Sequence, residues 1–138
     1  MNYRIRETGG LVYFSPALRV SYRPRPSLPA LARQYFHYGR WRREVMRQHP
    51  GSVSLRYLAP PVALVGFTAG LVAGMAGLRP AFVLPSGYVV LVLGGSAVVG
   101  RDLPPRAQAV LPAVLATMHG AWGAGFLTSV RSRTRGRG

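Results

Sequence analysis

The sequence lacks several residue types, and each absence narrows what the chain can do. It has no cysteine, so it forms no disulfide and offers neither a thiolate metal ligand nor a cysteine nucleophile. It has no lysine either, because all 18 basic residues are arginine. Acidic side chains are limited to Glu7, Glu44 and Asp102, which leaves a formal net charge of +15. A single aspartate makes a Ser-His-Asp set untenable.

Arginine and apolar residues are segregated along the chain. Residues 1–56 contain eleven arginines, whereas residues 57–130 contain three arginines and Asp102. Apolar residues make up 49% of the sequence, too many for a disordered basic tail. At a rise of about 1.5 Å per residue, 21 residues span roughly 31 Å, which matches a bilayer's hydrocarbon core. We therefore predict a transmembrane region at 57–130 with three helical spans, at 57–78, 80–100 and 107–130.

The distribution of arginine predicts the orientation. Eleven arginines before the first span place the N-terminal segment in the cytoplasm of a bacterial cell, with a multi-pass anchor in the plasma membrane. Three spans would place the four-arginine basic tail, 131–138, on the outside, against the same rule. The third segment contains Pro112 and His119, so a re-entrant or interfacial course that returns the tail to the cytoplasm is the alternative.

Residues 27–56 precede the membrane region as an interfacial helix and a linker. The pattern at 27–49 predicts the helix, which is of a different kind from the three spans. Ser27 can cap this helix, Pro29 is tolerated in its first turn, and Pro50-Gly51 ends it. An apolar and aromatic stripe lies beside an arginine face, which suits a helix in the membrane interface on anionic lipids. The alternative is a helix packed on a soluble domain.

Glycines mark the places where helices are expected to approach closely. Gly66, Gly70, Gly74 and Gly77 fall near one face of the first predicted span, where a neighbouring helix could pack. A functional glycine groove is the second interpretation of this row. Gly39, inside the helix at 27–49, indicates either a close contact or a bend.

Residues 1–26 predict a short α/β segment. Residues 2–7 are helix-like, and residues 11–14 and 18–22 suit two short strands. Two short strands cannot bury a core, so we expect the rest of the sheet to come from elsewhere in the protein or from a partner. The predicted fold class is thus mainly α and membrane-embedded, with a short α/β segment at the start.

Three runs of residues resemble a known family. In order they resemble the end of the catalytic domain, the interfacial segment and the last membrane helix of bacterial family 2 glycosyltransferases of the exopolysaccharide (succinoglycan-biosynthesis) type. The resemblance covers essentially the whole chain and makes residues 1–26 the C-terminal remnant of a nucleotide-sugar domain of the GT-A type. The runs are NYRIR at 2–6 with Gly9-Gly10 and 12–20, RQYFHYGRWR at 33–42, and Met118-His119 with Trp122-Gly123 and Gly125-Phe126-Leu127.

The resemblance implies inverting transfer of a sugar from a nucleotide donor. That chemistry uses an Asp-x-Asp motif to hold Mg²⁺ or Mn²⁺ on the diphosphate and a carboxylate base for the acceptor hydroxyl. Neither is present: Asp102 falls in a loop between spans, Glu7 lies beyond the NYRIR run, and Glu44 suits a surface ion pair with nearby arginines. We expect Met1 to fall just after the catalytic acids. The chain should then bind no metal and be inactive without the missing catalytic domain.

Some family members carry a Gln-x-x-Arg-Trp motif that holds the donor diphosphate and the acceptor. Gln34, Arg40 and Trp41 are the corresponding candidates here, although five residues separate Gln34 from Arg40 instead of two. Arg40 would contact a diphosphate and Trp41 would stack on a sugar. The alternative is that Arg40 and Trp41 anchor the helix in the interface.

Two other functions compete with the membrane-anchoring part of a glycosyltransferase. The first is an independent small membrane scaffold or accessory subunit without catalytic activity, which leaves the predicted strand pair unexplained. The second is nucleic-acid binding, suggested by the charge of +15. We do not expect nucleic acid as a partner, because the arginine excess beside membrane spans is already explained by orientation. The three histidines are too far apart in the sequence to predict a metal site, and His119 suits a hydrogen bond between helices.

Overall fold

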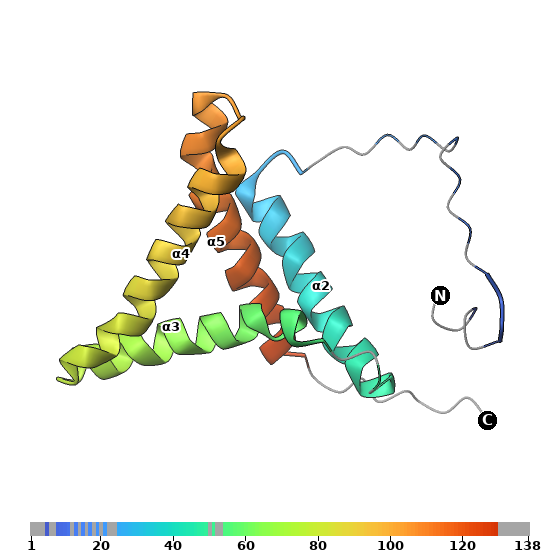
Figure 1. Cartoon of the computed structure of the whole chain (residues 1–138). Coiled ribbons are helices and arrows are strands. Elements are labelled where there is room, and N and C mark those ends of the chain that lie inside the picture. Colours follow the sequence, from blue (N-terminus) through green and yellow to red (C-terminus); the bar gives the residue numbers. More distant parts are fainter. Residues whose placement is uncertain are drawn as a thin grey trace.

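The computed structural model describes residues 25–49, 51 and 54–129, together with residue 5, residues 8–11 and every second residue from 13 to 21. Within this part the regular structure is helical throughout (Figure 1). The α-helices are α2 (Leu28–Gln48), α3 (Ala59–Met75), α4 (Val83–Gly100) and α5 (Pro105–Leu127), and two short 3-10 helices are η2 (Leu55–Tyr57) and η3 (Arg79–Phe82).

Helix α2 confirms the helix predicted at 27–49. The Ser27 side chain caps its N-terminus by accepting a hydrogen bond of 3.4 Å from the Ala30 backbone N–H. The helix ends at Gln48, and the N–H of His49 still donates to Val45 at 2.9 Å. Capping and breaking residues therefore set both ends of α2.

The apolar region differs in detail from the three predicted spans. Helix η3 continues into α4, so Arg79–Gly100 forms one helical segment of 22 residues. This segment and α5, of 23 residues, are long and apolar enough to cross a membrane. Helix α3 is equally apolar but has 17 residues, fewer than the predicted span at 57–78, because it ends at a turn where Gly77 has a positive φ of 106°.

The helices α3, α4 and α5 form the three sides of a triangle in Figure 1, and α2 lies beside α5. Helix α5 contacts each of the other three α-helices. The other close contacts lie between α3 and α4, near the turn that joins them. Helix α5 is therefore the centre of the assembly.

Two of the four glycines in the predicted row lie at a helix contact. A Cβ on Gly70 would approach the carbonyl oxygen of Ala81 to 2.7 Å, and one on Gly74 would approach the Phe82 ring to 2.7 Å. Gly66 and Gly77 face open space. The prediction of close packing is thus confirmed at the end of α3 that faces η3 and α4.

The α/β segment predicted for residues 1–26 is not supported. Residues 11, 13, 19 and 21 are described and belong to no strand, and Leu11 and Tyr13 are 96% and 84% exposed. The described residues offer these positions no neighbouring strand, and an unpaired strand cannot form its hydrogen-bond ladder. The remaining residues of the two predicted strands, residues 2–4, 6 and 7, and the basic tail at 131–138 lie outside the described residues.

Candidate functional site

A hollow of about 480 Å³ lies where α2 meets η2 and α5. We call it the aromatic hollow, because four of its six lining residues are tyrosine or tryptophan. Trp41 stands at its edge with 67% of its surface exposed, so a ligand could reach the indole face. The lining residues are His37, Tyr38, Trp41, Arg42, Tyr57 and Trp122.

Backbone contact between α2 and α5 brings Trp122 to this position. A Cβ on Gly39 would collide with the carbonyl oxygen of Trp122, and a Cβ on Gly125 would collide with that of Phe36. Glycine at both positions lets the two helix backbones touch. The Trp122 ring then packs on Tyr35, with ring centroids 6.4 Å apart. The close contact considered for Gly39 from the sequence is confirmed.

The Arg42 guanidinium gives the aromatic hollow a positive charge, and a second guanidinium, that of Arg56, lies near the Tyr57 ring. The Arg42 guanidinium lies 3.4 Å above the Tyr57 ring, and that of Arg56 lies 5.0 Å from it. Arg56 also donates a hydrogen bond of 3.0 Å to the Tyr57 hydroxyl. This bond, with the charges of Arg42 and Arg56, lowers the pKa of Tyr57 from its ordinary 10.0.

Trp122 also carries an unsatisfied donor. The indole Nε1 of Trp122 is buried and has no hydrogen-bond partner among the described residues. The aromatic rings of the hollow and the Arg42 guanidinium together suit a sugar that carries a phosphate.

The three site residues predicted from the sequence divide over two sides of α2. Trp41 lines the aromatic hollow, and Gln34 lies two turns earlier, where its amide donates to the Tyr38 hydroxyl at 2.6 Å. Arg40 is exposed and does not line the hollow. It lies about 100° around the helix from Trp41. Binding by these three residues stays a prediction.

Arg42 is the residue that the sequence analysis missed. It follows Trp41 directly and also lies about 100° from it, on the side opposite Arg40. Its position depends on Tyr57, which reaches the hollow from the far side of the residue 50–54 connection. Because this contact comes from a different part of the chain, no signal in the local sequence could have identified Arg42.

The carboxylates of the described region are engaged with arginine. Glu44 lies 3.4 Å from Arg47, which confirms the predicted surface ion pair, and Asp102 lies 3.2 Å from Arg101 in an exposed turn. The described residues contain no group of three or more His, Asp or Glu side chains that could hold a metal ion. This part of the chain therefore offers no residues that fit a catalytic divalent metal.

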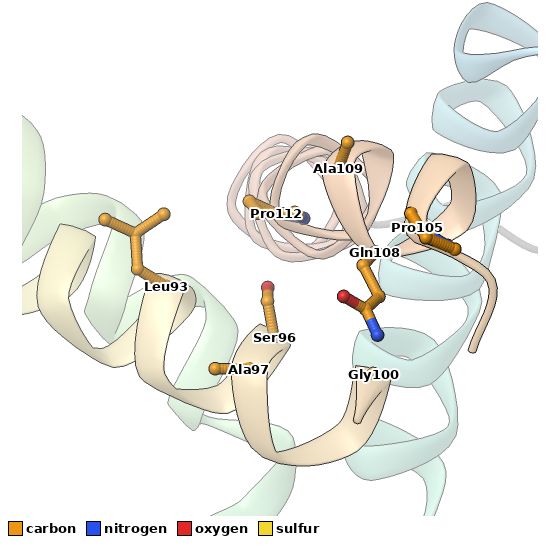
Figure 2. A pocket seen from close by; sticks show the side chains of 8 residues that line it. All are labelled: Leu93, Ser96, Ala97, Gly100, Pro105, Gln108, Ala109 and Pro112. Carbon is orange, nitrogen blue, oxygen red and sulfur yellow. The ribbon is translucent and has the colours of Figure 1, made fainter. Parts of the chain in front are cut away.

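Two further hollows lie among the apolar helices. Figure 2 shows the hollow of about 400 Å³ between α4 and α5, near their connecting turn. Its polar groups are satisfied, since Ser96 donates to the Val92 carbonyl at 2.7 Å and Gln108 to the Leu103 carbonyl at 2.9 Å. The other, of about 410 Å³, lies between α3, α4 and α5, where Tyr88 and His119 are 3.4 Å apart. His119 thus makes the interhelical contact predicted for it.

These features define a helical protein with apolar, membrane-type helices and an aromatic, arginine-lined hollow on its amphipathic helix. The chain is similar to the succinoglycan biosynthesis protein ExoA of Rhizobium meliloti (strain 1021), with 32% identity over 132 residues. The match covers 91% of this chain and 38% of that relative, so the chain spans well under half of the relative's length. No protein-family profile matches the sequence, and no solved structure matches it.

Proposed function

We propose that this chain is the membrane-anchoring C-terminal part of an inverting family 2 glycosyltransferase that acts in bacterial cell-surface polysaccharide synthesis. The observation that carries the proposal is the similarity to a succinoglycan biosynthesis protein along 91% of the chain. The sequence order of an amphipathic helix followed by apolar helices supports an anchor at the plasma membrane. The eleven arginines before residue 57 support a cytoplasmic N-terminal segment.

In this proposal the groups needed for sugar transfer belong to two parts of one enzyme. This chain has no Asp-x-Asp motif, and its carboxylates Glu44 and Asp102 are paired with arginine. The base and the ligands for Mg²⁺ or Mn²⁺ would therefore belong to a catalytic domain that binds the nucleotide-sugar donor. The 138-residue chain should transfer no sugar when it is purified alone in lipid.

In this proposal the aromatic hollow helps to position a phosphorylated sugar beside that catalytic domain. Trp41 presents an exposed ring face on which a sugar can stack, and Arg42 lies beside it. Gln34 and Tyr38 extend the polar surface along α2 toward Arg25, which donates to Gln34 at 3.0 Å.

A chimera tests the proposal. In the Rhizobium meliloti relative, the segment that aligns with this chain is replaced by the chain, and the chimera is expressed in a strain lacking the relative. We expect membrane association and restored succinoglycan in the medium. A chimera that accumulates in the membrane at the level of the parent protein but restores no polymer would refute the proposed function.

A further inference from the structure

The exposed apolar surface is not shared equally among the three apolar helices. Five large apolar side chains of α3 and eight of α4 are exposed, whereas α5 exposes only Val110 and Leu127, near its two ends. A helix that faces lipid presents apolar side chains to it. The exposed side chains of α3 and α4 fit such surroundings. The large apolar side chains of α5 other than Val110 and Leu127 are partly covered, because α5 packs on α2, α3 and α4.

Helix α5 runs beside α2 in the same direction, from one end to the other. Near their N-termini, Leu31 and Val110 line one shared hollow. At their C-termini, the Arg43 guanidinium donates to the carbonyl oxygens of Phe126 and Leu127, each at 2.7 Å. These carbonyls belong to the last turn of α5, where carbonyl oxygens have no hydrogen-bond partners within the helix itself. Whatever depth α2 has in a membrane, α5 therefore shares.

Helix α2 cannot lie at hydrocarbon depth. Its 21 residues include five arginines and Glu44. An arginine at the centre of a spanning helix costs about 2.5–3.5 kcal/mol even on the most lenient scale. The same arginines are favourable beside anionic headgroups, at about 1 kcal/mol each. Helix α2 is thus placed at the membrane surface, and α5 is placed there with it.

We infer that α3 and α4 cross the bilayer as a helical hairpin, while α2 and α5 lie together on the anionic headgroups of the cytoplasmic face. Arg79, at the tip of the hairpin, then reaches the opposite headgroups, and the other 17 arginines stay on the cytoplasmic side. This inference rests on the membrane-anchoring function proposed above. A topology with three spans would instead place Arg79 and the four arginines of the tail on the outside.

The lengths of α3 and α4 agree with a hairpin that crosses the bilayer. Helix α3 has 17 residues and Arg79–Gly100 has 22, which correspond to about 26 Å and 33 Å at 1.5 Å per residue. Both lie near the roughly 30 Å of a hydrocarbon core. Glycines at the contact between α3 and α4, such as Gly70 and Gly74, allow the tight packing that joins helices in lipid.

Single cysteines test the inference cleanly, because the chain has none of its own. The full chain is expressed in bacteria as the variants Arg79→Cys, Asp102→Cys and Thr128→Cys, all at exposed positions. Alkaline carbonate extraction first establishes whether the chain stays in the membrane. Spheroplasts and inverted membrane vesicles are then treated with a membrane-impermeant maleimide, and labelling is compared between the two preparations.

We expect positions 102 and 128, at the two ends of α5, to be labelled only in inverted vesicles, and position 79 only in spheroplasts. Labelling of 102 and 128 from opposite sides would make α5 a spanning helix and overturn the inference. Labelling of 79 from the same side as 102 would overturn it as well, since the hairpin would not cross. A chain released by carbonate would overturn both the inference and the proposed anchoring function, whereas the other two adverse results leave anchoring intact.

Discussion

Two glycines of α5 allow the contact between α2 and α5 to be tested with the same substitution. A Cβ at Gly125 would collide with the Phe36 carbonyl oxygen of α2, whereas a Cβ at Gly120 meets nothing within 4 Å. Gly125→Ala therefore forces the two backbones apart. Gly120→Ala changes the same helix by the same methyl group without touching α2, and so serves as the matched control.

The expected difference between the two variants follows from helix propensity and overpacking. Alanine in place of glycine inside a helix stabilises by about 1 kcal/mol, so Gly120→Ala should raise the free energy of unfolding by up to that amount. Gly125→Ala gains the same term but adds an overpacking cost of about 1–3 kcal/mol, since a backbone carbonyl cannot rotate away as a side chain can. We therefore expect Gly125→Ala to be about 1–3 kcal/mol less stable than Gly120→Ala.

Tryptophan fluorescence in mixed lipid–detergent micelles, titrated with sodium dodecyl sulfate, measures this difference. The chain has two tryptophans, so a Trp41→Phe background isolates Trp122, which packs on Tyr35 at the contact. Both variants are compared in that background. If Gly125→Ala were as stable as Gly120→Ala within experimental error, the backbone contact between α2 and α5 would be refuted, and the placement of α5 beside α2 would lose its support.

Three further predictions follow from the same region. Arg43→Gln removes hydrogen bonds to two terminal carbonyls of α5 and should lower the free energy of unfolding by about 1–2 kcal/mol in the same titration; an unchanged midpoint would contradict it. The pKa of Tyr57 is lowered, so its ionisation stabilises the folded chain as pH rises from the lowered pKa toward 10.0, and this gain is lost as pH falls. An ultraviolet difference titration against Tyr57→Phe should show that Tyr57 ionises at a lower pH than an ordinary tyrosine. Arg56→Gln should move this ionisation back to higher pH. In the chimera, Trp41→Ala should reduce succinoglycan output severalfold at equal protein level, whereas Trp41→Phe, which keeps an aromatic ring, should retain most of it. Equal loss in both variants would contradict stacking of a sugar on this ring.

The local sequence predicted the helices well, because their ends depend on residues close by. Ser27 supplies its cap within three residues, and the uncharged stretches after residue 56 could only form apolar helices. The same reasoning failed for residues 11–14 and 18–22. Their strand-like patterns require a neighbouring strand, which the described residues do not contain.

The site was predictable only in part, since it joins residues far apart in the sequence. Trp41 was found because Arg40-Trp41 resembles the end of the family's Gln-x-x-Arg-Trp motif. Trp122 and Tyr57 were not, because they reach the hollow only after α5 and η2 have packed on α2. Gly39 was the one local sign that another backbone comes close, and it did not reveal which.

The parallel pairing of α2 and α5 requires the chain between them to return from one end of the pair to the other. The chain leaves α2 at its C-terminal end, where Pro60 and Leu64 of α3 contact Gly123 of α5. It must return to the opposite end of α5, where Gly100 of α4 contacts Leu111. A single helix laid back along α5 could make that return. Instead, α3 and α4 travel away from α5 to meet at Arg79, with their apolar side chains exposed on the way (Figure 1). This detour costs free energy in water and is favourable in lipid, which is the physical reason for assigning the membrane to α3 and α4.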